Sequence, residues 1–176
     1  MTAKTPRIYL AGPDLFFFDA AFRYELLKKQ CALRGFVGVA PVEAEDGPIE
    51  RTPEGARKIM HRNIALLAQC DGVLANLIPF HGLEADSGTC FEVGYAYARG
   101  MPIAAYTIDP RTMLERASLA HLTDGTTPED FGLPVNLMLG GAASIHVRAD
   151  QALDALLEHF PGLQAASAAS GVALPA

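Results

Sequence analysis

The stretch DGVLANLIPF, residues 71–80, is a nearly unbroken apolar run, and it restricts the possible folds more than any other part of the chain. Such runs are typical of strands that are buried on both faces, as in parallel sheets covered by helices. Similar short runs alternate along the chain with segments of helical periodicity, which favours right-handed crossovers between parallel strands. Strands are expected at 7–12, 36–41, 71–80, 102–108 and 144–147, and helices at 19–34, 53–70, 87–99 and 149–160. The sequence therefore predicts an α/β fold, a single-domain three-layer sandwich with a parallel sheet.

The chain has 176 residues, which is enough for one domain with a buried core. We expect this domain to span residues 1–162 and to be followed by a flexible, Ala- and Ser-rich tail at 163–176. Ligands of such sheets bind beyond the carboxyl ends of the strands. Loops are expected at 11–18, 43–53, 78–88 and 109–134. Three loops, at 11–18, 78–88 and 109–136, are expected to surround one cleft.

Composition excludes several classes of protein. The formal net charge is −6 and no cluster of Lys or Arg occurs, which disfavours nucleic acid as a partner. No apolar run reaches the roughly 20 residues that span a bilayer, and the N-terminus has no signal-peptide pattern, so we expect a cytoplasmic protein that does not bind membranes. Cys31, Cys70 and Cys90 have no metal-ligand or redox spacing and are expected to be reduced core thiols.

The segment EADSGTCFEVGYA, residues 84–96, carries three carboxylates through a glycine-containing loop into a predicted helix. Glu92 is expected in the first turn of that helix, where backbone N–H groups and the helix dipole keep a carboxylate ionised. An ionised, fixed carboxylate suits a nucleophile that forms a glycosyl intermediate, although acids also stabilise first turns without any further role. Asp86 is either the N-cap of this helix or a ligand contact. Gly88 permits close approach by an anion, a sugar or a packed neighbour.

Three further polar residues interrupt apolar segments. Tyr9 lies in the first strand, and its hydroxyl is expected either to bind a carboxylate in the cleft or to pack in the core. Asn63 and Asn136 are each either local turn formers or ligand contacts, because buried amides require hydrogen-bond partners. Dinucleotide, Walker and Ser-nucleophile motifs are absent from the sequence.

Three motifs in order resemble the nucleoside 2-deoxyribosyltransferases. They are IYLAGPDLF (8–16), HRNIALLAQCDGVLANLIPFHGLEADSGTCFEVGYA (61–96) and FGLPVNLML (131–139), and the resemblance covers roughly residues 7–160. It implies a flavodoxin-like domain that exchanges the base of a 2′-deoxyribonucleoside by double displacement. The motifs place the nucleophile of the family on Glu92 and the Tyr that holds it on Tyr9.

The resemblance also implies the substrate contacts. Asp86 corresponds to the ligand of the 5′-hydroxyl, and Asn136, with Met138 in the same segment, corresponds to residues that complete the site of a neighbouring subunit. We also expect substrate contacts from Gly12, Phe16, Asn63 and Gly88. The expected partners are 2′-deoxyribonucleosides, free nucleobases and further copies of the chain in a homo-oligomer, a dimer or dimer-based. No metal or organic cofactor is required.

Two positions depart from the family pattern. Asn63 stands where some members have an Asp that contacts the leaving base, so the proton donor to that base is not assigned. His81 stands in the PF-x-G loop where an Arg is expected.

Two alternatives share these residues. The first is a deoxynucleoside or deoxynucleoside 5′-monophosphate N-glycosidase, in which water resolves the intermediate; the charge of Asp86 disfavours a 5′-phosphate, whereas Ser87 and Thr89 favour one. The second is a nucleoside-sensing module without turnover. The choice between purine and pyrimidine depends on the loops 11–18 and 43–53.

Overall fold

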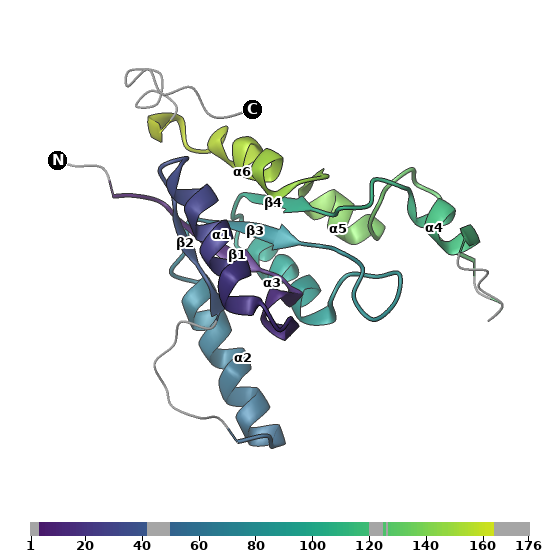
Figure 1. Ribbon diagram of the computed structural model, residues 1–176, viewed down its shortest axis with the longest axis horizontal. Coiled ribbons are helices and arrows are strands. Elements are labelled where there is room, and N and C mark those ends of the chain that lie inside the picture. Colours follow the sequence, from purple (N-terminus) through teal and green to yellow (C-terminus); the bar gives the residue numbers. More distant parts are fainter. Residues whose placement is uncertain (1–3, 42–49, 120–124, 126, 164–176) are drawn as a thin grey trace.

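Five parallel strands form the single sheet of the computed structural model, which describes residues 4–41, 50–119, 125 and 127–163 (Figure 1). The strands are β1 (Arg7–Ala11), β2 (Val37–Val39), β3 (Gly72–Asn76), β4 (Ile103–Tyr106) and β5 (Ser144–His146). Their order in the sheet is β2-β1-β3-β4-β5, and every neighbouring pair is parallel. This order is that of a flavodoxin-like, doubly wound sheet, so the predicted fold class is confirmed. The chain reverses its direction of winding between β1 and β3, where ligands of such folds bind.

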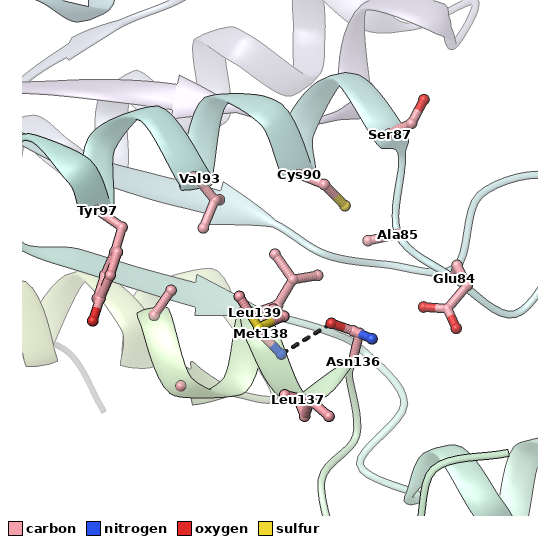
Figure 2. A pocket seen from close by; sticks show the side chains of 13 residues that line it. Glu84, Ala85, Ser87, Cys90, Val93, Tyr97, Asn136, Leu137, Met138 and Leu139 are labelled. Carbon is pink, nitrogen blue, oxygen red and sulfur yellow. Dashed lines mark hydrogen bonds between the residues drawn. The ribbon is translucent and has the colours of Figure 1, made fainter.

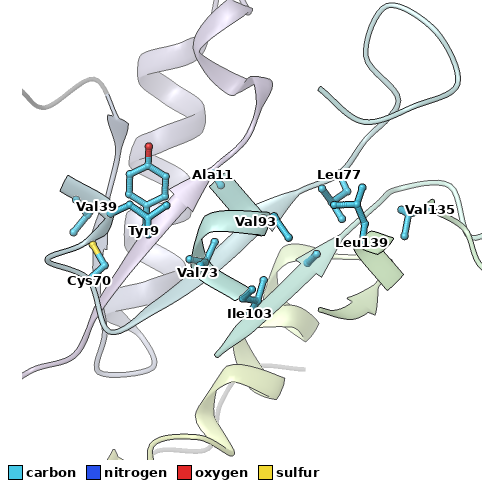
Figure 3. Packing of buried hydrophobic residues seen from close by; sticks show 14 residues of the cluster. Tyr9, Ala11, Val39, Cys70, Val73, Leu77, Val93, Ile103, Val135 and Leu139 are labelled. Atoms are coloured by element: carbon cyan, nitrogen blue, oxygen red, sulfur yellow. The ribbon is translucent and has the colours of Figure 1, made fainter. Parts of the chain in front are cut away.

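Helices cover both faces of the sheet. They are α1 (Ala20–Ala32), α2 (Pro53–Leu67), α3 (Ser87–Ala98), α4 (Met113–Leu119), α5 (Leu137–Ala142) and α6 (Ala149–Leu157), together with the short 3₁₀ helix η1 (Pro13–Phe16). One core cluster joins the sheet to α1 and α6, and a second joins it to α2, α3 and α5 (Figures 1 and 3). The three layers that the sequence predicted are therefore present.

Alternation along β1 decides which layer each of its side chains enters. Ile8 and Leu10 pack in the cluster with α1 and α6, whereas Tyr9 and Ala11 pack in the cluster with α2 and α3. Tyr9 is fully buried and its ring lies beside Val39 and Val73 of the neighbouring strands (Figure 3). Its hydroxyl consequently points into the layer that contains α3.

The prediction of a continuous loop at 109–134 is wrong, because this segment contains α4. Thr112 and Glu115 form a reciprocal cap at its start: the N–H of Glu115 donates to the Thr112 hydroxyl (3.2 Å), and the N–H of Thr112 donates to the Glu115 carboxylate (2.7 Å). A Thr-x-x-Glu pattern is a sequence signal for a helix start. The helix has only seven residues, and its apolar periodicity is therefore weak.

The exit loop predicted at 11–18 contains η1, which a buried polar contact holds against β3. Asp14 is 3% exposed and accepts a hydrogen bond of 2.8 Å from the side chain of Asn76 at the end of β3. Gly12 lies in the same contact: a Cβ at this position would lie 2.7 Å from the Cβ of Asn76 and 2.8 Å from Oδ2 of Asp14. Only glycine therefore fits between these two side chains.

The domain boundary at residue 162 stays a prediction, and one residue of the expected tail is described by the structure. Leu163 packs against the cluster beneath α1 and α6, and it is the nearest side chain to Gly35. The rest of the predicted flexible tail, residues 164–176, lies outside the described residues, as do residues 42–49 of the loop predicted at 43–53.

Candidate active site

A hydrogen bond between Tyr9 and Glu92 is the centre of the candidate site. The Tyr9 hydroxyl donates to Oε1 of Glu92 over 2.6 Å, which joins β1 to α3 across 83 positions of sequence. Burial, followed by the nearby charge of Glu92, raises the pKa of Tyr9 far above its usual value, so this phenol stays protonated and remains a donor. Of the two predicted roles for Tyr9, the contact with a carboxylate is the one that the structure shows, although the ring also packs in the core.

Glu92 lies deeper in α3 than predicted, and its ionisation differs accordingly. It is the sixth residue of α3, in the second turn and beyond the reach of the helix dipole at the N-terminus. Its pKa is raised from 4.5 to about 7: burial is the largest cause and the charge of Asp86 adds to it, while hydrogen bonds from Tyr9 and Asn63 act in the opposite direction. The prediction that Glu92 stays fully ionised is therefore wrong. At pH 7 the carboxylate and the neutral acid are both populated, as in carboxyl groups used for acid, base or nucleophilic chemistry.

Glu92 opens onto a cavity of about 280 Å³ between α2 and α3. Its polar side chains are Glu92 and Asn63, and its other lining residues are apolar or glycine: Ala56, Ile59, Met60, Ile64, Gly88 and Phe91. Oδ1 of Asn63 is buried and accepts no hydrogen bond from the described residues. A buried acceptor without a donor is unfavourable, so a ligand that supplies an N–H or O–H is favoured here. The structure thus brings Asn63 and Gly88 together with Glu92, as predicted.

Asp86 is the N-cap of α3. Its Oδ2 accepts hydrogen bonds from the backbone N–H of Thr89 (2.8 Å) and from the Thr89 hydroxyl (2.9 Å). Of the two predicted roles, the structural cap is therefore observed, and Asp86 also acts electrostatically on Glu92, whose pKa its charge raises. Its contact with a ligand stays a prediction.

Asn136 and Met138 lie on the other side of α3 from Glu92. They line a larger, mainly apolar cavity of about 670 Å³ between α3 and α5, into which Cys90, Val93 and Tyr97 of α3 project (Figure 2). Gly88 and Glu92 line the smaller cavity instead, so the two cavities use different faces of one helix. The expected single cleft is divided: within one chain, Asn136 does not join the site of Glu92.

The side chain of Asn136 caps α5 and is bound by a residue that was not predicted from the sequence. Oδ1 of Asn136 accepts from the N–H of Met138 (2.9 Å), and Nδ2 donates to Oε1 of Glu129 over 2.6 Å. Oε2 of Glu129 accepts from the N–H of Leu137 (2.7 Å). Glu129 precedes Asn136 by seven residues in a predicted loop, and no periodicity in the sequence distinguishes it.

Phe16 and His81 both contact the ring of Phe80, in the segments that follow β1 and β3. The rings of Phe16 and Phe80 are 5.3 Å apart, and the rings of Phe80 and His81 are 4.0 Å apart. Phe16 is 62% exposed, and it does not line the cavity of Glu92. Gly12 is enclosed by Asn76 and Asp14, so packing alone requires a glycine at this position. Substrate contacts by Phe16 and Gly12 stay predictions.

In the part of the chain that the structure describes, no group of three or more His, Cys, Asp or Glu side chains is arranged to hold a metal ion. None of the helices there is both long and apolar enough to cross a membrane.

The sheet order and the Tyr9–Glu92 pair define the class of this protein: a flavodoxin-like domain with a half-buried acid near the point where the winding reverses. Residues 8–138 match the family of nucleoside 2-deoxyribosyltransferases, and the chain belongs to that family. The members of this family are enzymes that bind nucleosides and nucleobases.

The chain is also similar to individual proteins. A 2-desoxiribosyltransferase from Leishmania mexicana has 32% sequence identity and a TM-score of 0.76, over 88% of this chain and 98% of that one. A 2-deoxyribosyltransferase from Bacillus psychrosaccharolyticus has 16% identity and a TM-score of 0.57, over 82% of this chain and 88% of that one, and shares the fold. An uncharacterized protein of Schizosaccharomyces pombe is 37% identical over 116 residues, 64% of this chain and 55% of the yeast protein. The chain thus spans about half the length of this curated relative.

Proposed function

We propose that this protein transfers the 2-deoxyribosyl group between the nucleobases of 2′-deoxyribonucleosides through a covalent intermediate on Glu92. The observation that carries the proposal is the 2.6 Å hydrogen bond from Tyr9 to Glu92, beside a cavity whose other polar side chain is Asn63. A carboxylate held in one orientation next to a partly apolar cavity is suited to attack on a sugar carbon. Family membership supports the same chemistry.

In the first step, an oxygen of the Glu92 carboxylate forms a bond to C1′ of the deoxyribose. The C1′–N bond breaks, and its electron pair leaves with the base. The transition state has oxocarbenium character, and the negative charge of Glu92 stabilises it. Because the side chain of Asn63 is an amide, it can bind the leaving base but cannot protonate it, so the proton comes from water or from the entering base.

In the second step, a nitrogen of a second base attacks C1′ from the face opposite Glu92, and the ester bond to Glu92 breaks. Two inversions at C1′ give overall retention. Tyr9 donates to the carboxylate throughout and stabilises Glu92 as it regains its charge. A 2′-deoxy sugar suits this reaction because no electron-withdrawing hydroxyl adjoins the developing cation.

The charge of Asp86 favours a free 5′-hydroxyl over a 5′-phosphate. We further propose that the protein works as a homo-oligomer, a dimer or dimer-based, in which Asn136 of one chain completes the site of the next. The division of the two cavities by α3 supports this proposal, because Asn136 lies away from Glu92 of its own chain. Salvage of bases in the cytoplasm is the physiological role that this activity suggests.

Chromatography of the purified protein incubated with 2′-deoxyinosine, with and without adenine, tests the reaction. New 2′-deoxyadenosine that forms only with adenine is the expected result. Hypoxanthine that accumulates equally in both incubations would instead identify an N-glycosidase. A protein that releases no base from 2′-deoxyinosine or from thymidine, yet binds them, would be a sensing module.

A further inference from the structure

Glu129 fixes the orientation of the Asn136 amide. A carboxylate only accepts hydrogen bonds, so the edge of the amide that faces Oε1 of Glu129 at 2.6 Å must be its NH₂ group. Oδ1 then faces the N–H of Met138 at 2.9 Å. With both edges assigned, the second N–H of Asn136 remains available as a donor, since the described residues offer it no acceptor.

The same carboxylate is anchored by the backbone. Its second oxygen accepts from the N–H of Leu137 at 2.7 Å, so both oxygens of Glu129 are used and its orientation is fixed in turn. A hydrogen bond to a charged group is stronger than one between neutral groups, and a flipped amide would set its oxygen against the carboxylate, which strongly disfavours that orientation. Without Glu129, the amide of Asn136 would be free to rotate away from its cap.

We propose that Glu129 is a positioning residue for recognition of the 5′-hydroxyl of the substrate; this rests on the function proposed above. Glu129 directs the second N–H of Asn136, which has no acceptor among the described residues, at the 5′-oxygen in the site of the neighbouring subunit. The hydroxyl proton is then available for Asp86, whose carboxylate can only accept. The 5′-hydroxyl thus acts as donor to Asp86 of one chain and as acceptor from Asn136 of the other.

The competing explanation is that Glu129 only stabilises the start of α5. The two explanations differ in their dependence on the substrate. A structural role affects every substrate equally, whereas a positioning role affects only substrates that have a 5′-hydroxyl. The discrimination ratio, defined as kcat/KM for 2′-deoxyinosine divided by kcat/KM for 2′,5′-dideoxyinosine, separates them.

The experiment measures this ratio for the wild-type protein and for Glu129→Ala, Glu129→Gln and Asp130→Asn, with adenine as acceptor. The wild-type ratio should be at least about 10, the value of one charge-assisted hydrogen bond. Glu129→Ala should lower the ratio several-fold by slowing only the reaction of 2′-deoxyinosine, while the contact of the 5′-hydroxyl with Asp86 keeps the ratio above 1. Glu129→Gln should lie between the two, because its carbonyl can still accept from Asn136 while its NH₂ group meets the N–H of Leu137.

Asp130→Asn is the matched control, since Asp130 is the exposed neighbour and its replacement removes the same formal charge. It should keep the wild-type ratio. Equal slowing of both substrates in Glu129→Ala would overturn the proposal in favour of the structural role. A wild-type ratio in Asn136→Ala, in a protein that still exchanges bases, would overturn it while leaving the proposed function in place. A wild-type protein without base exchange would overturn both.

Discussion

Side chains on the two faces of helix α3 lie in different environments. On one face, Glu92 is half-buried beside α2, receives a hydrogen bond from Tyr9 and has its pKa raised to about 7. On the other face, Cys90 and Tyr97 line a cavity more than twice as large, which closes against α5 rather than against a reactive acid (Figure 2). One helix thus separates the candidate chemistry from the candidate surface for a second subunit. Residue type alone does not produce this difference; the packed neighbour of each face does.

Replacing Glu92 should give the largest effect. Glu92→Ala should lower kcat for base exchange by at least about 10³-fold, because the nucleophile is lost, while circular dichroism stays unchanged. Cys90→Ser, two residues away on the other face, should keep activity within about threefold. Full activity in Glu92→Ala would refute the covalent mechanism.

The second prediction concerns Asn136, which lies beside the other face of α3 and is proposed to complete the site of a neighbouring chain. Asn136→Ala should lower kcat/KM by about 10- to 100-fold through loss of a contact in the adjacent site. Mixing it with inactive Glu92→Gln under conditions of subunit exchange should restore about a quarter of wild-type activity, since each mixed dimer holds one intact site. No recovery on mixing, with mixed oligomers shown by mass spectrometry, would place Asn136 in its own subunit's site or outside any site.

The desolvation of Glu92 should also affect the free energy of unfolding. An acid whose pKa is raised by folding does not lower the free energy of unfolding at a pH below its unfolded pKa. Above its folded pKa, it lowers the free energy of unfolding by the full amount. The difference between 4.5 and about 7 corresponds to about 3 kcal/mol. Glu92→Gln should therefore raise the free energy of unfolding by up to about 3 kcal/mol at pH 8.5 and by little at pH 4, as measured by urea denaturation.

Glu84→Gln is the control for this measurement, because Glu84 is exposed and lines the other cavity. It should change the free energy of unfolding little at either pH. A Glu92→Gln variant that gains no more stability than Glu84→Gln at pH 8.5 would show that Glu92 is not desolvated in the folded protein.

The smallest effect expected is a displacement of the pH profile. In the wild-type protein, kcat/KM should rise with pH around a midpoint of about 7, as Glu92 loses its proton. Tyr9→Phe removes a hydrogen bond that lowers the pKa of Glu92, so the midpoint should move to higher pH. Asp86→Asn removes a charge that raises this pKa, so the midpoint should move to lower pH. Displacements in the same direction would contradict the assignment of these two influences.

The elements that carry the site could be predicted because their signals are local. The apolar run of β3 and the cap and periodicity of α3 are both contained in short segments of sequence. The ionisation of Glu92 could not be predicted in the same way, because its burial depends on α2, and its hydrogen bond to Tyr9 spans 83 positions. The role of Glu129 was missed although it is local, since a loop Glu carries no pattern until its hydrogen bonds are known.

The close contact of Gly12 with Asn76 also limits how base preference could be engineered. A library that varies the loop 11–18 would lose most of its members at Gly12, where any side chain meets Asn76, and at Asp14, which holds that loop to β3. Phe16 carries no such restriction, because it projects outward and is 62% exposed. A library that varies Phe16 and keeps Gly12, Asp14 and Asn76 unchanged would test base preference with few misfolded variants.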